Sequence, residues 1–350
     1  MADHKTYLGK INTPPPVAAT VANGLQATAA LMSIELDNGQ NALLDISKPR
    51  AAVWAQMMVT LQQEDKPVYI ETDAGTNIIS RLCIPVATKV LDIEPDGPDV
   101  VVALDASSAR HELHRSQPGF EQFYGVLQHA KESGDTILVT ATLHRFEIID
   151  VRPLPLSFNV ERQEVPPAPS ALAGPVVPIS FEKATQLFNM VNNQTCTPCS
   201  ATSPCIPFKY PPDGCWIRAH LMCYLMLADG ITPEKMWIQG RLKAKSSNVP
   251  GCSVSWAWHV APTLLVTQTD GQNIKMVIDP SLCDKPVTVD YWKSLQGDVN
   301  ARLTPSSWQG YGFLAAGSAT QIQANADMRK YRDFLNEMCA DHGPSPYNCP

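Results

Sequence analysis

The sequence predicts an α+β protein made of two domains. Its 350 residues exceed the length at which a single hydrophobic core usually stops growing. A proline-rich stretch separates two segments of mixed helical and strand-like pattern. In the second segment, a helix that is apolar around most of its circumference precedes strand-like runs, as in a central helix packed on an antiparallel sheet. We therefore expect a flexible tail over 1–16, a smaller α+β domain over 17–152, a linker over 153–178 and a second α+β domain over 179–350.

Composition limits the classes of partner. The net charge of −7 argues against a nucleic-acid or anionic-membrane partner, because both need a basic surface. The sequence contains no run of about 18 apolar residues, so we expect no transmembrane helix. The apolar-leaning stretch 17–32 is interrupted by Asn23, Gly24 and Gln26, which argues against a cleaved secretion signal.

The ten cysteines are unevenly distributed. Cys83 is alone in the first half, and the other nine lie between Cys196 and Cys349. This crowding predicts disulfides, and hence an oxidising destination, without fixing their connectivity. Cys196 and Cys199 have zinc-ribbon spacing, but no second pair or nearby histidine completes four ligands, so we expect no metal and no cofactor. A zinc-stabilised adaptor that uses Cys196, Cys199 and Cys205 remains as an alternative.

The first domain is expected to combine two helices with six β-rich runs. Helical spacing of apolar residues predicts helices over 51–63 and 119–133. The β-rich runs are 68–72, 78–84, 88–93, 100–104, 136–143 and 146–151. His111 and His114 are one residue short of the spacing that places two imidazoles on one helix face, so we expect them at the surface.

A stretch around Cys215 predicts an activated thiol. Residues 211–214, Pro-Pro-Asp-Gly, are turn formers, whereas 216–227 contains no proline or glycine and is rich in helix formers. Cys215 is therefore expected on the first turn of a helix. There, unpaired backbone N–H groups and the positive end of the helix dipole stabilise a thiolate, the nucleophilic form of cysteine. An ordinary buried cysteine that begins a core helix is the structural alternative.

A base and an orienting carboxylate are candidates further along the chain. His259 lies in a strand-like run over 254–266, and alternation places Trp256 and Trp258 on the opposite face. After an Asp-Gly turn signal a second run ends in Asp279, so the two runs should be antiparallel neighbours. A carboxylate beside the imidazole fixes its tautomer and stabilises the imidazolium. A histidine satisfied within the sheet and a turn-forming aspartate are the structural alternatives.

Five motifs resemble those of bacterial protein-glutaminase, the protein-deamidating enzyme, and occur in the same order. They are CIPFKY at 205–210, DGC with RAH between 213 and 220, GRLKA at 240–244, AWHVA at 257–261 and IDPSL at 278–282. The resemblance covers 179–292, about a third of the chain.

The resemblance implies deamidation of glutamine side chains in proteins or peptides, with release of ammonia, by a Cys-His-Asp triad. These roles map onto Cys215, His259 and Asp279, and the implied fold of the second domain is papain-like or transglutaminase-like. Members of the family are secreted with an N-terminal pro-region, so we expect delivery outside the producing cell. Transglutaminase and cysteine peptidase activity with the same triad, or a non-catalytic binding module, remain as alternatives.

Supporting residues are less sharply indicated. An oxyanion needs two donors, and the Cys215 backbone N–H is the natural first one; Asn193 and Gln194 are candidates for the second. Trp256 and Trp258 are candidates for the walls of a slot for the glutamine side chain, with packing against the sheet as the alternative. The first domain is expected to be either a pro-domain or a targeting domain. A pro-domain would cover the thiol and inhibit the enzyme until the linker is cut.

Overall fold

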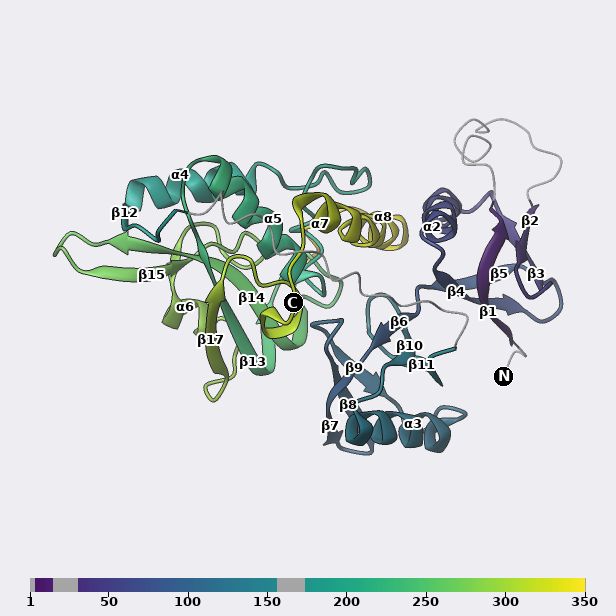
Figure 1. Cartoon of the computed structure of the whole chain (residues 1–350). Coiled ribbons are helices and arrows are strands. Elements are labelled where there is room, and N and C mark those ends of the chain that lie inside the picture. The colour runs from purple at the N-terminus through teal and green to yellow at the C-terminus, as the bar shows by residue number, and fades with distance from the viewer. Residues whose placement is uncertain (1–3, 15–30, 156–173, 350) are drawn as a thin grey trace. The chain divides into compact units, whose positions relative to one another are not determined.

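The computed structural model describes residues 4–14, 31–155 and 174–349 as an α+β protein with mainly antiparallel sheets (Figure 1). The chain forms two compact units. The first comprises Met1–Val102, His111–Val160 and Asn336–Gly343, and the second comprises Ala103–Arg110, Glu161–Leu335 and Pro344–Pro350.

The sequence boundary between the domains is therefore too simple. The segment Ala103–Arg110, expected in the first domain, packs with the second unit, and Asn336–Gly343, expected in the second domain, packs with the first. A segment that packs with the other unit leaves no signal in the composition of the sequence, because it is short and no linker separates it from its neighbours in the chain. Most of the proline-rich linker, 156–173, lies outside the described residues.

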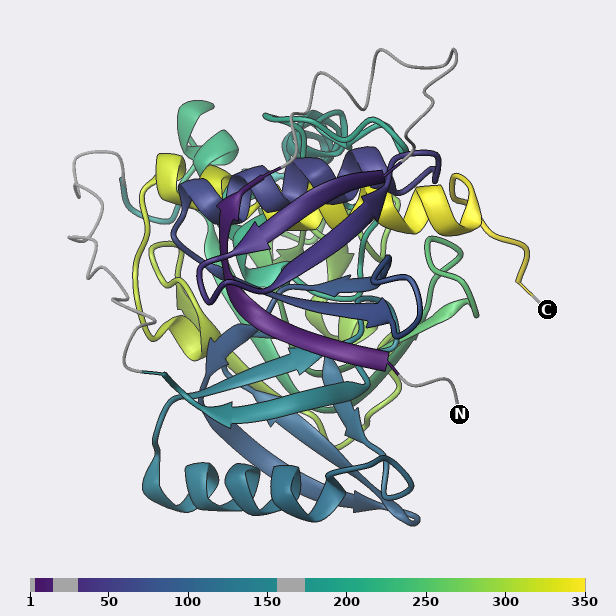
Figure 2. The same ribbon diagram turned by 90° about the vertical axis from the view of Figure 1, so that its right-hand side faces the viewer.

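In the first unit, a five-stranded antiparallel sheet has the order β3-β2-β1-β4-β5. Its strands are β1 (His4–Thr13), β2 (Leu31–Leu36), β3 (Asn41–Asp45), β4 (Pro67–Asp73) and β5 (Ile79–Cys83). Helix α2 (Ala51–Gln63) packs on β1 and β4 (Figures 1 and 2). It buries Trp54, Met57, Met58 and Leu61. The expected flexible tail over 1–16 is wrong for His4–Thr13, because β1 is the central strand of this sheet and pairs with both β2 and β4. Residues 1–3, 15 and 16 lie outside the described part of the chain.

The rest of the first unit consists of two three-stranded sheets and helix α3 (Phe120–Ser133), which packs on β7 and β11. The sheets have the orders β11-β10-β6 and β7-β8-β9. Their strands are β6 (Val86–Thr88), β7 (Val90–Asp96), β8 (Asp99–Leu104), β9 (Arg110–Leu113), β10 (Ile137–Ala141) and β11 (Ile148–Pro153). The expectation for His111 is wrong: this residue lies on β9 and is buried.

The second unit is built on a six-stranded sheet. Strands β16-β15-β14-β13-β17 follow one another in antiparallel pairs, and β12 adds to β14 in parallel. These strands are β12 (Ile179–Ser180), β13 (Glu234–Lys245), β14 (Ser253–Thr267), β15 (Asn273–Val277), β16 (Val287–Thr288) and β17 (Arg302–Ser307). The helices are α4 (Phe181–Asn192), α5 (Cys215–Ala228), α6 (Val289–Ser294), α7 (Gln321–Asp327) and the first part of α8 (Arg329–His342), whose residues from Asn336 onward belong to the first unit.

Helix α5 is the central element of the second unit. It packs against β14, α7 and α4, and almost every side chain along it is buried, as its apolar sequence predicts. Disulfides Cys196–Cys205 and Cys252–Cys349 cross-link loops of the same unit, which confirms the expectation of disulfides. Among the described residues no group of His, Cys, Asp or Glu side chains is arranged to hold a metal ion. No helix in the described ranges is long and apolar enough to cross a membrane.

Candidate active site

Cys215 occupies the first position of helix α5, as predicted, and its side chain is buried. The turn before it depends on Gly214, whose φ of +78° favours glycine. A Cβ at this position would lie 2.8 Å from the ring of Tyr331. The backbone that aims the thiol is therefore fixed both by conformation and by a close neighbour.

Replacing Gly214 with alanine should destabilise the protein by about 1–3 kcal/mol, because it adds an overlap with Tyr331 to the strain of a left-handed residue. Gly230 is a matched control, since its φ is also +78° but nothing lies within 4 Å of its Cβ position. Thermal unfolding of Gly214→Ala and Gly230→Ala separates the two effects. Equal losses in both variants would contradict a specific role for the contact with Tyr331.

His259 and Asp279 form a buried pair. The Nε2 atom of His259 lies 2.8 Å from Oδ2 of Asp279 and donates its proton to the carboxylate. The register of β14 and β15 brings them together: Thr263 pairs with Val277, and the following residue, Ile278, donates its N–H to the carbonyl oxygen of Pro262. Both side chains are almost completely buried. The predicted antiparallel neighbours and the predicted approach of the two side chains are both present.

The imidazole of His259 carries a positive charge at neutral pH. Burial acts to lower its pKa, but the Asp279 carboxylate and the Cys215 thiol outweigh burial and raise the pKa to about 9. Nδ1 is buried and makes no hydrogen bond within the described residues. Because Nε2 is engaged by Asp279, Nδ1 is the nitrogen available to the thiol. This arrangement suits a thiolate–imidazolium pair.

Asp279 is held by more partners than the sequence indicated. Its Oδ2 also accepts a hydrogen bond from the indole Nε1 of Trp292 (2.9 Å), and Oδ1 accepts one from the N–H of Ser281 (3.1 Å). Burial acts to raise the pKa of Asp279, but the positive charge and hydrogen bond of His259, the hydrogen bond from Trp292 and the charge of Arg218 lower it overall. Trp292 lies on the short helix α6, and nothing in its local sequence singles it out.

Trp256 departs from the expected alternation along the strand. Its ring stacks on the imidazole of His259, with centroids 4.7 Å apart and planes within 9°, although alternation placed the two residues on opposite faces. The register of β13 and β14 shifts between Gln239 and Leu242, where β13 carries one residue more than the part of β14 from Trp256 to Trp258. The expected opposite placement of Trp256 is therefore wrong.

Both candidate tryptophans are fully buried and donate to backbone carbonyls. Trp256 Nε1 lies 3.1 Å from the oxygens of Pro211 and Pro212, and Trp258 Nε1 lies 3.0 Å from the oxygen of Leu104. Trp256 thus connects β14, which carries His259, to the turn that precedes Cys215. That either indole contacts the glutamine side chain of a substrate stays a prediction.

Arg218 also holds the turn that precedes Cys215. It lies one turn after Cys215 on α5, is almost completely buried, and donates from Nη1 to the carbonyl oxygens of Tyr210 and Asp213. In the sequence, Arg218 is one of few polar residues on an apolar helix. The structure explains how a charged side chain is accommodated there, because the guanidinium donates to backbone oxygens and does not face solvent.

The segment Ala103–Arg110 lies against the turn and against β14. The carboxylate of Asp213 accepts hydrogen bonds from the N–H of Ser108 (2.8 Å) and from the hydroxyls of Ser107 and Ser108 (3.0 Å each). The N–H of Ala257 donates to the carbonyl oxygen of Ser108 (2.9 Å). The segment therefore runs along the site, on the edge of β14 that β15 leaves free. The sequence does not predict these hydrogen bonds, since they join residues more than 100 positions apart.

Gln194 follows helix α4 in a hydrogen-bonded turn and is half-buried. Its N–H donates to the carbonyl oxygen of Val191 (3.0 Å), and its own carbonyl oxygen accepts from the N–H of Ile206 (2.7 Å). Disulfide Cys196–Cys205 closes this loop. The backbone of Gln194 is thus well fixed, and the use of its side-chain amide, or that of the exposed Asn193, as an oxyanion donor stays a prediction.

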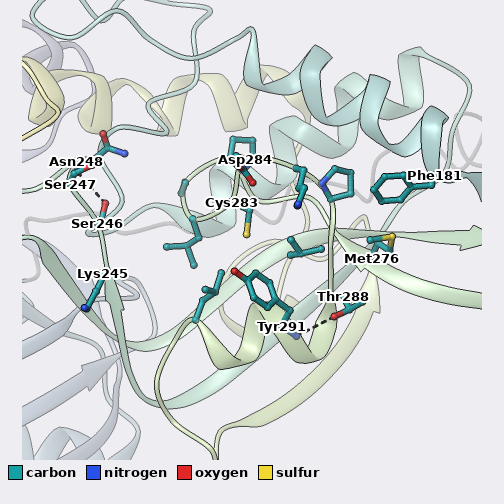
Figure 3. A pocket seen from close by; sticks show the side chains of 17 residues that line it. Phe181, Lys245, Ser246, Ser247, Asn248, Met276, Cys283, Asp284, Thr288 and Tyr291 are labelled. Atoms are coloured by element: carbon teal, nitrogen blue, oxygen red, sulfur yellow. Dashed lines mark hydrogen bonds between the residues drawn. The ribbon is translucent and has the colours of Figure 1, made fainter.

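A cavity of about 870 Å³ lies beside the loop that follows Asp279 (Figure 3). Its lining includes Cys283, Asp284, Tyr291 and Phe181, but none of Cys215, His259 and Asp279. Cys283 is a free, partly exposed cysteine. Thiol reagents that enter this cavity would therefore report on Cys283 and not on the candidate nucleophile.

Comparisons with known proteins point to one family. A glutaminase family model matches residues 184–296. A solved mutant of pro-protein-glutaminase is 26% identical, with 70% of this chain and 91% of that chain covered and a TM-score of 0.57. A protein-glutaminase structure is 30% identical over 45% of this chain and 89% of that chain, with a TM-score of 0.39. Protein-glutaminase from Chryseobacterium proteolyticum is 30% identical over 44% and 88%, with a TM-score of 0.38. No curated protein matches the chain. The glutaminase family model and the similarity to pro-protein-glutaminase identify the chain as a member of the protein-glutaminase family.

Proposed function

We propose that this protein hydrolyses the side-chain amide of glutamine residues in proteins or peptides, giving glutamate and ammonia. The observation that best supports the proposal is the buried His259, held by Asp279 through Nε2 while Nδ1 stays available to the Cys215 thiol. Membership of the protein-glutaminase family supports protein deamidation in general. The catalytic unit then has the papain-like or transglutaminase-like arrangement of nucleophile helix and antiparallel sheet.

In the first half of the reaction, the Cys215 thiolate attacks the carboxamide carbon of glutamine. The resulting oxyanion is stabilised by the Cys215 backbone N–H and by a second donor, for which Gln194 is the candidate. The imidazolium of His259 gives its proton to the departing nitrogen, so ammonia leaves and a thioester forms.

In the second half, His259 is neutral and removes a proton from water, which attacks the thioester carbon. The C–S bond breaks, glutamate is released, and the thiolate–imidazolium pair is restored. Asp279 stays ionised throughout and stabilises the imidazolium. No cofactor takes part in these steps.

Product analysis with a single glutaminyl peptide separates the proposal from its alternatives. Incubation should release one ammonia per glutamine converted and leave the peptide backbone intact. Lysine supplied in excess should not become cross-linked. Cross-linking would indicate a transglutaminase, peptide-bond cleavage would indicate a cysteine peptidase, and no reaction at all would favour a binding module.

We further propose that the first unit inhibits the enzyme. The segment Ala103–Arg110 supports this role: it packs with the second unit although the chain on both sides of it belongs to the first, and its hydrogen bonds to Asp213, Ala257 and Trp258 hold it beside the turn that precedes Cys215. Solved relatives include pro-forms of protein-glutaminase. These pro-forms, together with disulfides such as Cys196–Cys205 and Cys252–Cys349, are consistent with an extracellular enzyme. A targeting role for the first unit is the alternative.

Limited proteolysis between 153 and 178 should raise the deamidation rate, because cutting the connection lets the inhibitory segment leave. Ammonia release before and after cleavage measures the effect. Ser107→Ala combined with Ser108→Ala removes two hydroxyl donors to Asp213 and should raise the rate of the uncut chain in the same direction. Equal rates before and after complete cleavage would favour the targeting role.

A further inference from the structure

Two exposed aromatic rings line the cavity beside the loop that follows Asp279. Phe181 is 45% exposed and Tyr291 is 55% exposed. Single exposed apolar side chains are common on protein surfaces, whereas aromatic rings gathered at one hollow are typical of a binding surface. The cavity therefore has the composition of a site for an apolar group.

Both rings stand on the first turns of helices whose ends are capped by side chains. Ser180 Oγ accepts from the N–H of Lys183 at the start of α4, and Thr288 Oγ1 accepts from the N–H of Tyr291 at the start of α6. These caps fix the backbone that carries each ring, although the rings themselves are exposed. Rings on a fixed backbone lose little conformational freedom when a partner binds.

The cavity is elongated (Figure 3). Lys245 lies at one end, Cys283 and Tyr291 lie in the middle, and Met276 and Phe181 lie at the other end. A hollow of this shape, with a volume of about 870 Å³, has room for several residues of an extended chain. Its shape therefore favours a polypeptide over a compact small molecule.

The two ends of the cavity differ in charge. Lys245 is exposed, and its Nζ forms no ion pair within the ranges that the structure describes. Lys285 adds a second positive charge to the lining and Asp284 adds one negative charge, so the lining is positive overall although the whole chain carries a net charge of −7. An acidic group is therefore favoured near Lys245, and an apolar group between Phe181 and Tyr291.

The cavity and the candidate active site share a loop. Residues 280–286 line the cavity and begin directly after Asp279, and the N–H of Ser281 donates to Oδ1 of that carboxylate. Cys215 and His259 do not line the cavity, so it does not take the reacting glutamine. A polypeptide with its glutamine at Cys215 has other residues that run over the neighbouring surface.

We propose that this cavity binds a second segment of the substrate protein, away from the glutamine. The segment is extended and carries an acidic residue, which lies near Lys245, and an aromatic or aliphatic residue, which lies between Phe181 and Tyr291. The proposal rests on the proposed deamidation of glutamine in proteins, and it adds a preference for the sequence around that glutamine.

Binding of a peptide without glutamine tests the proposal in the full chain. The probe is a fluorescent Gly-Ser peptide that carries phenylalanine and glutamate, and its Kd is measured by fluorescence anisotropy. Tyr291→Ser should raise the Kd about tenfold. Lys245→Glu should raise it about fivefold and should reverse the preference in favour of a peptide with lysine in place of glutamate. Ile322→Ser, which removes an exposed apolar side chain outside the cavity, should leave the Kd unchanged.

A second measurement needs no variant of the cavity. Met276 lines the cavity, so its methyl signal in protein labelled with ¹³C-methyl methionine should shift when the peptide is added. Met57 and Met58, which are buried on α2 of the first unit, should not shift. An unmoved Met276 signal, or an equal Kd for the unaltered chain and Tyr291→Ser, would overturn the proposal. Self-association that Tyr291→Ser abolishes, without peptide binding, would assign the cavity to a second copy of the chain and would also overturn it.

Kinetics connect the cavity to substrate choice. With a disordered protein substrate that carries phenylalanine and glutamate near its glutamine, Tyr291→Ser should raise the KM for ammonia release about tenfold and leave kcat unchanged. With a blocked glutaminyl dipeptide, which is too short to reach the cavity, neither constant should change. Equal losses with both substrates would show that the substitution acts through the Asp279 loop and would overturn the proposal. Because the binding probe contains no glutamine, failure of deamidation and failure of this cavity to bind are distinguishable.

Discussion

Replacing Cys215 with alanine should reduce ammonia release to the uncatalysed background, a loss of about 10⁶-fold in rate. The reason is that no other group lies at the start of helix α5 beside His259, so no thioester can form. Ammonia release from a glutaminyl peptide measures the effect. Substrate binding should persist, because the proposed donors and the strand edge of β14 remain.

Two free cysteines of the same unit provide controls for this variant. Cys223→Ala removes a buried thiol two turns further along α5, and Cys283→Ala removes the thiol that lines the cavity beside the Asp279 loop. Both variants should retain most of the activity if they fold, as checked by circular dichroism. Full activity in Cys215→Ala, or a comparable loss in Cys283→Ala, would contradict the assignment of the nucleophile.

The main features of the site were predictable because their signals are local. Turn formers followed by an uninterrupted helical run placed Cys215 at a helix start, and the structure begins α5 at that residue. Two strand-like runs separated by an Asp-Gly turn predicted the antiparallel pair that brings His259 and Asp279 together. In each case a short stretch of sequence determines both the element and the direction of its side chains.

The features that were missed depend on contacts between distant residues. Trp292 donates to Asp279 across a loop and a helix start, and Ser108 reaches Asp213 from another part of the chain. Strand β1 resembled a tail because its exposed residues and the prolines that follow it hide a strand that other strands stabilise on both edges. Trp256 was misplaced because alternation along a strand does not predict the stacking of its ring on His259. Propensity cannot supply these contacts, since tertiary packing determines them.

Replacing Asp279 with asparagine should lower the deamidation rate by about three to four orders of magnitude. An amide nearly matches the carboxylate in shape but has one oxygen, which can replace either Oδ2, the acceptor for His259 and Trp292, or Oδ1, the acceptor for Ser281. Its NH₂ group cannot accept a hydrogen bond at the other position, and in either orientation it has no charge to stabilise the imidazolium. Trp292→Phe removes one donor while leaving the carboxylate, and a much smaller loss is expected there.

The pH dependence of Asp279→Asn gives a second, independent readout. The raised pKa of His259, about 9, means that the imidazolium and its stabilising effect are fully present below the unfolded-state pKa of about 6.5 and are lost as pH rises through about 9. Without the carboxylate, burial lowers the pKa of His259, so the alkaline decline of rate and of thermal stability should move to lower pH. Rate and melting temperature are measured from pH 5 to pH 10, with Asp270→Asn, on an exposed turn, as the control. An alkaline limb that stays in place in Asp279→Asn would show that this carboxylate does not set the charge of His259.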